Sequence, residues 1–229
     1  HNIHSAAISS DTSTAPQNYN INVENQYDVA PTDITFEQNS GVKLNSDGSN
    51  NTKMSVADSG DIVGGLTSMT LETQFSSTND LSLDGDYMAL FSYHAGGGSD
   101  EIELSFDNNG GELQLSLEIG EQTVYTSGYD TSQLLDGGDH QVSVTWDNVS
   151  GEWSIYVDGA VVESGTGLAT GHTIASGGMI VLGQEQDNLD GGYDSNQEFV
   201  GTYQDVRIFN DVRTAQEIAD NANIEISED

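Results

Sequence analysis

Residues 185–197, which we call the acidic loop, concentrate oxygen donors that could bind a cation. The loop contains four carboxylates, several amides and the pair Gly191-Gly192, and the apolar runs on either side of it are typical of strands. Calcium takes about 6–8 oxygen ligands and accepts mixtures of carboxylate, amide and carbonyl donors. A loop of this kind between two strands therefore predicts a calcium site. The alternative is an acidic loop that is merely solvated.

The spacing of these side chains favours one shared site. Glu185 and Asp187 are two residues apart, so an extended backbone points both carboxylates to the same side. Asp194 and Gln197 are three residues apart in a turn that follows glycines, so they can close around the same point. Acids packed this closely without a cation would repel one another and shift toward protonation. A calcium ion on an exposed loop would keep open positions for sugar hydroxyls, a carboxylate or a phosphate.

The charge of the chain limits its partners. The 229 residues include 38 acidic and 4 basic side chains, which gives a formal charge of -34. Nucleic acid is excluded because its phosphates would be repelled, and an anionic membrane surface is disfavoured for the same reason. No run of apolar residues is long enough for membrane insertion. The chain has no cysteine and therefore no disulfide framework, and calcium could supply the cross-linking instead.

Alternating patterns place the acidic loop in an all-β chain. Apolar side chains recur with period two in residues 69–75, 101–106, 113–119, 142–146 and 153–157. Trp146 and Trp153 are in phase with these patterns and are expected in the core. Asp158-Gly159 has the composition of a two-residue hairpin turn. Many short strands with one polar face predict an antiparallel sandwich of two sheets.

The ends of the chain differ from this pattern. Residues 1–25 are rich in Ser, Thr, Asn and Ala, and they are expected to form a linker or a loosely ordered arm. Residues 26–229 are expected to form a single domain. The capping box at Thr214-Ala215-Gln216-Glu217 is the one good helix signal and predicts a short C-terminal helix.

Six motifs follow one another through the last third of the chain: HQVSVTW at 140–146, WSIYVDG at 153–159, LGQEQD at 182–187, FVG at 199–201, DVRIF at 205–209 and TAQEI at 214–218. In this order they resemble the laminin G-like and pentraxin group of lectin-type domains. Residues 66–106 fit the earlier strands of that group more weakly. The resemblance implies a concanavalin A-like, antiparallel two-sheet jelly-roll sandwich, with calcium as its cofactor.

The resemblance also implies a ligand set, because the matching loop of pentraxins binds two calcium ions. Glu185 and Asp187 would bridge both ions. The main-chain carbonyl of Gln186 would add a ligand to one ion, and Asp194 and Gln197 would complete the other.

The remaining family ligands come from a pair ahead of an apolar strand, which here reads Ser99-Asp100. Three features depart from the family pattern: Asp194 replaces a longer Glu, Ser99 replaces an Asp, and the disulfide of many pentraxins is absent. Asp190 is an extra acid where glycine is usual, and it could add a compensating ligand.

Other side chains near the site could contact a bound sugar. Tyr193 and Asn188 lie within the acidic loop, and Tyr93 and His94 come shortly before Asp100. An aromatic ring beside the ion could stack on a sugar ring. The alternative for Tyr93 is packing within a sheet, and the alternative for His94 is an ordinary surface position.

An enzymatic alternative comes from Glu185-x-Asp187, which also resembles the Glu-x-Asp-x-x-Glu strand motif of retaining β-glucanases. Such enzymes need two carboxyls about 5–5.5 Å apart. Here the third acid is the shorter Asp190, and the motif falls in a loop rich in Gly and Asn. No nucleophile elbow, phosphate loop or zinc spacing appears, so no enzyme is expected.

These observations together predict a calcium-dependent carbohydrate-binding, lectin-like module. We expect it to be extracellular or on the cell surface, in a bacterial adhesin, beside adjacent modules of a larger surface protein. A structural alternative is a sandwich that calcium stiffens as a spacer without binding glycans. A retaining β-glucanase is the further alternative.

Overall fold

The computed structural model describes residues 21–24, 34–37, 41–44, 52–56, 60–97 and 99–222. Its strands are β1 (Ile21–Glu24), β2 (Ile34–Glu37), β3 (Gly41–Leu44), β4 (Lys53–Val56), β5 (Ser68–Ser76), β6 (Tyr87–Ala95), β7 (Ser99–Asn109), β8 (Glu112–Ile119), β9 (Gln122–Tyr125), β10 (His140–Asp147), β11 (Glu152–Val157), β12 (Ala160–Gly165), β13 (Met179–Leu182) and β14 (Gly201–Phe209). Its helices are α1 (Gly60–Val63), the 3-10 helix η1 (Thr131–Leu135) and α2 (Ala215–Asn221).

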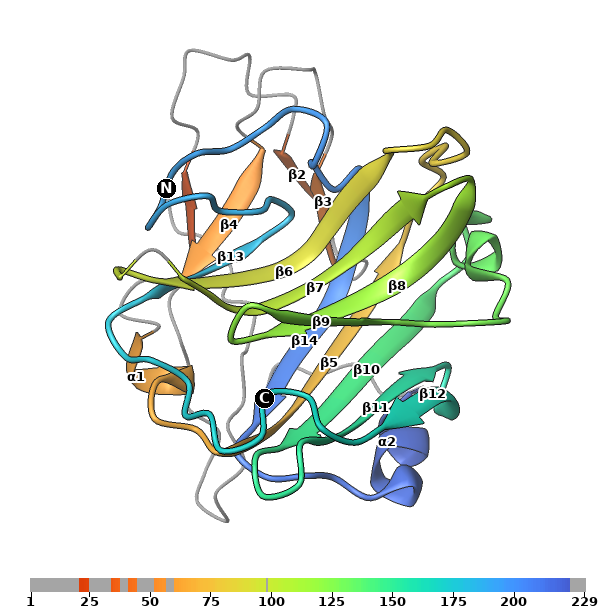
Figure 1. Cartoon of the computed structure of the whole chain (residues 1–229). Coiled ribbons are helices and arrows are strands. Elements are labelled where there is room, and N and C mark those ends of the chain that lie inside the picture. Colours follow the sequence, from red (N-terminus) through yellow and green to blue (C-terminus); the bar gives the residue numbers. More distant parts are fainter. Residues whose placement is uncertain are drawn as a thin grey trace.

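The strands form two sheets that pack face to face (Figure 1). Sheet A has the strand order β1-β4-β13-β6-β7-β8-β9, and sheet B has the order β12-β11-β10-β5-β14-β3-β2. Within the described ranges, every pair of neighbouring strands is antiparallel. The predicted antiparallel jelly-roll sandwich is confirmed.

The core lies between the sheets, and alternation along each strand builds it. Trp146 of β10 lies opposite Trp153 of β11, and these side chains are 0% and 8% exposed, so the predicted core position of both is confirmed. Leu71 and Phe75 of β5 and Leu104 of β7 are buried with them. Burial of each large apolar side chain contributes about 1.5–3 kcal/mol.

Local signals explain most of the turns and helix ends. Asp158 and Gly159 both have positive φ, 49° and 79°, as expected of a two-residue hairpin turn. At α2, the Thr214 side chain accepts a hydrogen bond from the Glu217 N–H, and the Glu217 carboxylate accepts one from the Thr214 N–H, so the capping box is confirmed. The sequence missed α1 and η1, because α1 is a single turn and η1 has no side-chain cap.

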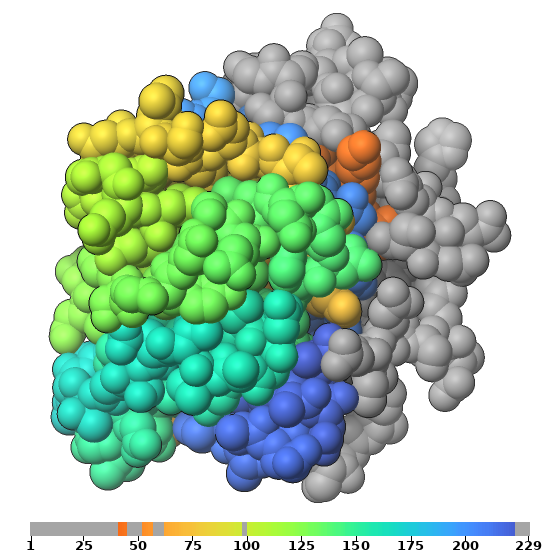
Figure 2. Space-filling model, turned by 90° about the vertical axis from the view of Figure 1, so that its right-hand side faces the viewer, coloured from red at the N-terminus to blue at the C-terminus, as the bar shows by residue number. Residues whose placement is uncertain are grey.

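Residues 126–139, the segment between β9 and β10 that contains η1, close one edge of the sandwich. Figure 2 shows this segment in green, between strands of sheet A and the β11–β12 hairpin of sheet B. The N–H and the hydroxyl of Ser127 both donate to Glu163 Oε2 of β12, at 2.9 and 2.6 Å. These bonds join the segment that follows β9, the edge strand of sheet A, to the edge strand of sheet B.

The ends of the chain remain largely outside the described residues. Of the predicted arm, the structure describes only Ile21–Glu24, which pairs with β4 as β1. At the other end, residues 223–229 lie outside the described residues. Among the helices that are described, none is both long and apolar enough to cross a membrane.

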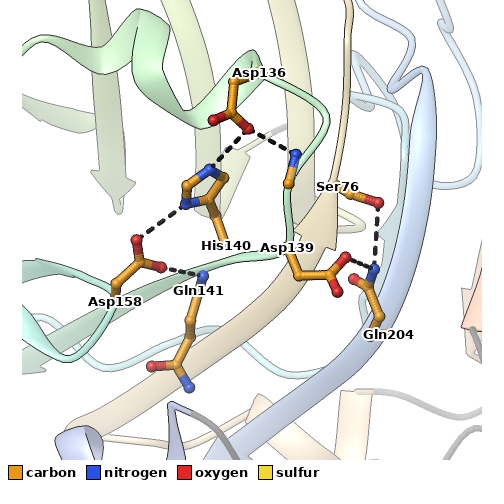
Figure 3. A network of polar contacts seen from close by, with 8 residues as sticks. Ser76, Asp136, Asp139, His140, Gln141, Asp158 and Gln204 are labelled. Atoms are coloured by element: carbon orange, nitrogen blue, oxygen red, sulfur yellow. Dashed lines mark hydrogen bonds and ion pairs between the residues drawn. The ribbon is translucent and has the colours of Figure 1, made fainter.

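A polar network fixes the start of β10 (Figure 3). Nδ1 of His140 lies 3.0 Å from Oδ2 of Asp158, and Nε2 lies 3.3 Å from Oδ1 of Asp136. Asp158 also accepts a hydrogen bond from the Gln141 N–H at 2.9 Å. One histidine therefore links the end of η1 to the turn between β11 and β12.

This network predicts a pH-dependent contribution to stability. Partial burial lowers the pKa of His140, but the hydrogen bonds and charges of Asp158 and Asp136 outweigh it and raise the pKa above its ordinary value of 6.5. The contribution of His140 is therefore fully present below about pH 6.5 and is lost as pH rises through the higher folded pKa. We expect His140→Gln to lower the melting temperature by roughly 2–4 °C at pH 6 and by less at pH 8.5. Equal losses at the two pH values would contradict this interpretation.

Candidate metal centre

The acidic loop connects sheet A to sheet B. It follows β13 and leads to β14, and its ends meet where the Phe199 N–H donates to the Gly183 carbonyl at 3.0 Å. The Ala89 N–H of β6 donates to the Gln197 carbonyl at 2.9 Å. The loop is thus closed on itself and attached to a neighbouring strand, which fixes the positions of its donors.

Gln186 anchors the middle of the loop. Its side chain is fully buried, and Nε2 donates to the Met179 carbonyl at 3.0 Å and to Ser92 Oγ at 3.2 Å. Its Oε1 accepts a hydrogen bond from the Asp190 N–H at 3.1 Å. Because the side chain is engaged in this way, the main-chain carbonyl is the group that remains for the predicted metal ligation.

The structure gathers the predicted ligands around Glu185. Burial and the charges of Asp187, Asp100 and Asp194 together raise the pKa of Glu185 to about 7, while a hydrogen bond with Gln197 opposes the rise. Asp100 thus reaches the loop from the start of β7, far away in sequence. Three of the predicted acids and Gln197 therefore act on Glu185 in the fold, while their assignment as metal ligands stays a prediction.

Two buried oxygen atoms of these residues have no hydrogen-bond partner, Oε2 of Glu185 and Oε1 of Gln197. An unpaired buried acceptor costs about 1–3 kcal/mol. Both atoms are hard oxygen donors, and they belong to residues predicted to hold calcium. The donor set therefore fits a calcium ion, which would be coordinated by Glu185, Asp187, Asp194, Gln197, Asp100 and the Gln186 carbonyl.

The described residues contain no group of three or more His, Cys, Asp or Glu side chains gathered closely enough to hold a metal by themselves. The four predicted carboxylates, those of Glu185, Asp187, Asp194 and Asp100, are therefore not close enough together in this structure to hold a metal by themselves. The predicted set also draws on the amide of Gln197 and the carbonyl of Gln186. Asp187 and Asp194 are both exposed, and they belong to the polar rim of the site.

Two of the predicted ligand-contacting residues are buried instead. Tyr93 is 0% exposed and donates its hydroxyl hydrogen to the Ala175 carbonyl at 2.8 Å, so the packing alternative holds and the sugar-contact prediction is wrong. His94 is 3% exposed, and its Nδ1 lies 2.8 Å from Asp100 Oδ1. The contact prediction is wrong for His94 as well, because its ring orients a predicted metal ligand rather than facing solvent.

Asp190 has a different role from the predicted one. Its Oδ1 lies 2.6 Å from Lys53 Nζ and accepts a hydrogen bond from the Tyr193 hydroxyl at 2.6 Å. Partial burial would raise the pKa of Asp190, but the hydrogen bonds and charge of these neighbours hold it below its ordinary value. Asp190 neutralises a buried lysine instead of adding a metal ligand, which corrects the prediction.

The other predicted residues keep their assignments as predictions. Tyr193 is half-buried, with its hydroxyl held by Asp190. Asn188 is exposed at the tip of the loop, where its main chain pairs with Gly191. Ser99 begins β7, and its side chain lies outside the described residues.

The sequence analysis missed Glu103, which lies next to the site. The Tyr87 hydroxyl donates to it, and burial raises the pKa of Glu103 to about 8, with a contribution from the charge of Glu185. The alternation of Ile102 and Leu104 into the core already placed Glu103 on the outer face of sheet A. That pattern could have identified it.

A model described as the Pentaxin family matches residues 49–225. Human neuronal pentraxin-2 is 37% identical over 134 residues, which cover 58% of this chain and 29% of that protein. The rat "Sushi, von Willebrand factor type A, EGF and pentraxin domain-containing protein 1" is 32% identical over 133 residues, which cover 58% of this chain and 4% of that protein. The chain thus spans less than a third of the length of these relatives.

Solved structures agree with the fold. The heptameric SAP-like pentraxin from Limulus polyphemus superposes with a TM-score of 0.59 at 20% identity, over 69% of this chain and 70% of that one. The receptor binding domain of a botulinum neurotoxin C/D mosaic serotype gives a TM-score of 0.62 at 14% identity, over 95% of this chain and 50% of that one. At these identities the likeness concerns the sandwich alone.

Proposed function

The chain belongs to the Pentaxin family, and on this premise we propose that it is a calcium-dependent, carbohydrate-binding module. Two observations on Glu185 carry the proposal: the charges of Asp187, Asp100 and Asp194 act on its carboxyl, and its Oε2 is buried without a hydrogen-bond partner, as is Oε1 of Gln197. A calcium ion would satisfy these atoms and offset the repulsion between the acids. When bound, the ion would supply open coordination positions to a ligand.

The surroundings of the site favour neutral sugar hydroxyls as that ligand. A ligand carboxylate or phosphate would approach exposed Asp187 and Asp194, with Glu103 and its strand neighbour Glu118 on the same sheet. The chain as a whole carries a formal charge of -34. A neutral vicinal diol can replace water on calcium without adding to this repulsion.

A glycan array read with calcium and with chelator tests the proposal. We expect binding to one or more neutral glycans in calcium, loss of that binding in EDTA, and loss of it in Asp187→Ala even with calcium present. Asp211→Ala is the matched control, because it removes an exposed acid at the far end of β14. If calcium-dependent binding were absent on every glycan, the carbohydrate-binding proposal would fail.

A structural role is the second candidate, and the length of the relatives favours it. The matching segment is 4% of the rat relative, whose name includes several other kinds of domain. In this version calcium only stiffens the sandwich between neighbouring modules. A calcium-dependent melting temperature together with an empty glycan array would support it.

We also propose that the module is not an enzyme. The third acid of the glucanase-like motif, Asp190, is bonded to Lys53 and Tyr193, so it is not free to donate or accept a proton. Hydrolysis of a β-glucan that is lost in Glu185→Gln would contradict this proposal.

We also propose a cellular location for the module. We place it outside the cell or on its surface, beside other modules of a larger protein, because calcium is abundant there and the relatives are longer than this chain. The two relatives named above are animal proteins, so they lend no support to the predicted bacterial adhesin.

A further inference from the structure

We infer that Lys53 is a positioning residue for the calcium site, and that it holds the acidic loop in its metal-binding shape through Asp190 and Tyr193. This inference rests on the proposed calcium binding. Lys53 lies in β4, which pairs with β13, the strand that leads into the loop (Figure 1). No metal ligand contacts Lys53 in the interactions described above, so its effect on calcium would be indirect.

Two contacts join the lysine to the loop, and a third, within the loop, links its two partners. The Lys53 ammonium lies 2.6 Å from Asp190 Oδ1 and 4.7 Å from the centroid of the Tyr193 ring. The Tyr193 hydroxyl donates to the same Asp190 oxygen at 2.6 Å. One buried cation thus holds two side chains of the loop by an ion pair and a cation–π contact.

The burial of Lys53 makes these contacts strong. Lys53 is 1% exposed, although it is one of only 4 basic residues among 38 acidic ones. A buried ammonium is unfavourable unless it is paired, and a single carboxylate oxygen of Asp190 provides the pairing. The folded state therefore strongly favours the loop conformation that brings Asp190 to Lys53.

The backbone at Asp190 supports the same conclusion. Asp190 has φ 52°, a left-handed conformation that favours glycine. It is the third residue of a tight turn in which Asn188 and Gly191 exchange main-chain hydrogen bonds at 3.1 and 2.9 Å. An aspartate at such a position is strained. Its ion pair with Lys53 explains why this position carries an aspartate rather than a glycine.

The turn is packed against a predicted metal ligand. A Cβ added to Gly192 would lie 2.4 Å from the Cβ of Asp187, so the two arms of the loop are in close contact at this point. Asp190 and Tyr193 flank Gly192 in the chain, so fixing them also limits the movement of Asp187. Without this restraint, calcium would have to order the loop as it binds.

The sign of one mutation separates positioning from simple electrostatics. Lys53 carries a positive charge near the site, so a purely Coulombic role predicts that its removal tightens calcium binding. A positioning role predicts the opposite. In Lys53→Met the remaining Asp190 side chain, which is 28% exposed, can still be hydrated, so this variant is expected to fold.

The experiment is calorimetric titration of CaCl2 into chelator-treated protein. We expect Lys53→Met to weaken calcium binding by about tenfold or more, as is typical when a group that supports metal ligands is removed. Lys43→Met is the matched control, because it removes the same charge from β3 of sheet B, and it should leave the affinity unchanged. The double variant Lys53→Met/Asp190→Gly, which leaves no unpaired charge and suits the positive φ, should also bind weakly. Unchanged or tighter binding in Lys53→Met would overturn the inference.

Limited proteolysis separates this inference from the calcium proposal. Chymotrypsin prefers sites such as Leu189 and Tyr193, and Leu189 is 46% exposed in the loop. In EDTA, we expect cleavage there to be faster in Lys53→Met than in the wild type or Lys43→Met. If the wild type binds no calcium, the proposed function fails, and equal cleavage rates would then overturn the role of Lys53 as well.

Discussion

Replacing Asp187 with alanine is expected to abolish most of the rise in melting temperature that calcium gives to the wild-type protein. A ligand present at 100 times its Kd stabilises the folded state by about 2.7 kcal/mol, which corresponds to roughly 5–11 °C for a domain of this size. Asp187 is one of the two predicted shared ligands, and its charge raises the pKa of the other, Glu185. Removing it takes away ligand atoms for both ions.

Thermal melts followed by circular dichroism in EDTA and in 5 mM CaCl2 measure this effect. Asp211→Ala, an exposed acid outside the loop, should keep the full calcium-dependent rise. A wild-type melt that does not change with chelator would argue against the metal site.

The second large effect is expected from Arg207→Met. Arg207 is 7% exposed on β14, where it forms an ion pair with Asp205 and lies 3.7 Å from the carboxylate of Glu72. Removing one member of a buried ionic group costs about 3–5 kcal/mol, because the remaining charges lose their partner. Arg213→Met is the control: Arg213 is partly exposed and pairs with Glu217, whose side chain is 45% exposed, so its loss should be smaller.

The pH dependence gives this prediction a second readout. Burial raises the pKa of Glu72 from 4.5 to about 7, against the opposing effects of Asn221 and Arg207. The folded state thus holds the proton of Glu72 more tightly than the unfolded state does. The loss of folding stability that comes from ionising Glu72 is therefore absent below about pH 4.5 and grows as pH rises toward 7 and above. Without Arg207, ionised Glu72 destabilises the fold more. Urea denaturation should therefore show that Arg207→Met lowers the free energy of unfolding more at pH 8 than at pH 5. An equal loss at both pH values would rule out this explanation.

Much of the sandwich could be predicted because alternation reports directly on burial. Val142, Val144 and Trp146 were placed in the core from their spacing alone, and they are fully buried. Asp158-Gly159 and the Thr214 box were predictable for a local reason, since turn and cap residues act on neighbouring backbone groups. The short helices α1 and η1 lack such local signals, so no pattern predicted them.

The candidate site was predictable where its residues are close in sequence. Glu185 and Asp187 were found by spacing, whereas the family resemblance was needed to bring in Asp100, because a contact between strands so far apart leaves no local pattern. The pairing of Lys53 with Asp190 was missed for the same reason. A single lysine in a short apolar run is typical of a solvated edge strand, and only the folded sheet shows that Lys53 is buried.

Tyr93 and His94 show a different limit. Tyr93 is in phase with core residues of β6, so the alternation along the strand indicated burial. Its short distance in sequence from Asp100 indicated contact with a ligand instead. The structure agrees with the alternation, since Tyr93 is 0% exposed and pairs with Ile102 in register. His94 is adjacent to Asp100 in the ladder, so nearness was correct but the expected exposure was not.

The most direct test of calcium binding is a crystal structure of the protein grown with calcium. We predict a strong density peak beside Glu185 Oε2 and Gln197 Oε1, coordinated by oxygens of Asp187 and the Gln186 carbonyl at about 2.3–2.6 Å. An ordered acidic loop at saturating calcium with only water at that position would contradict the calcium site, and with it the proposed function.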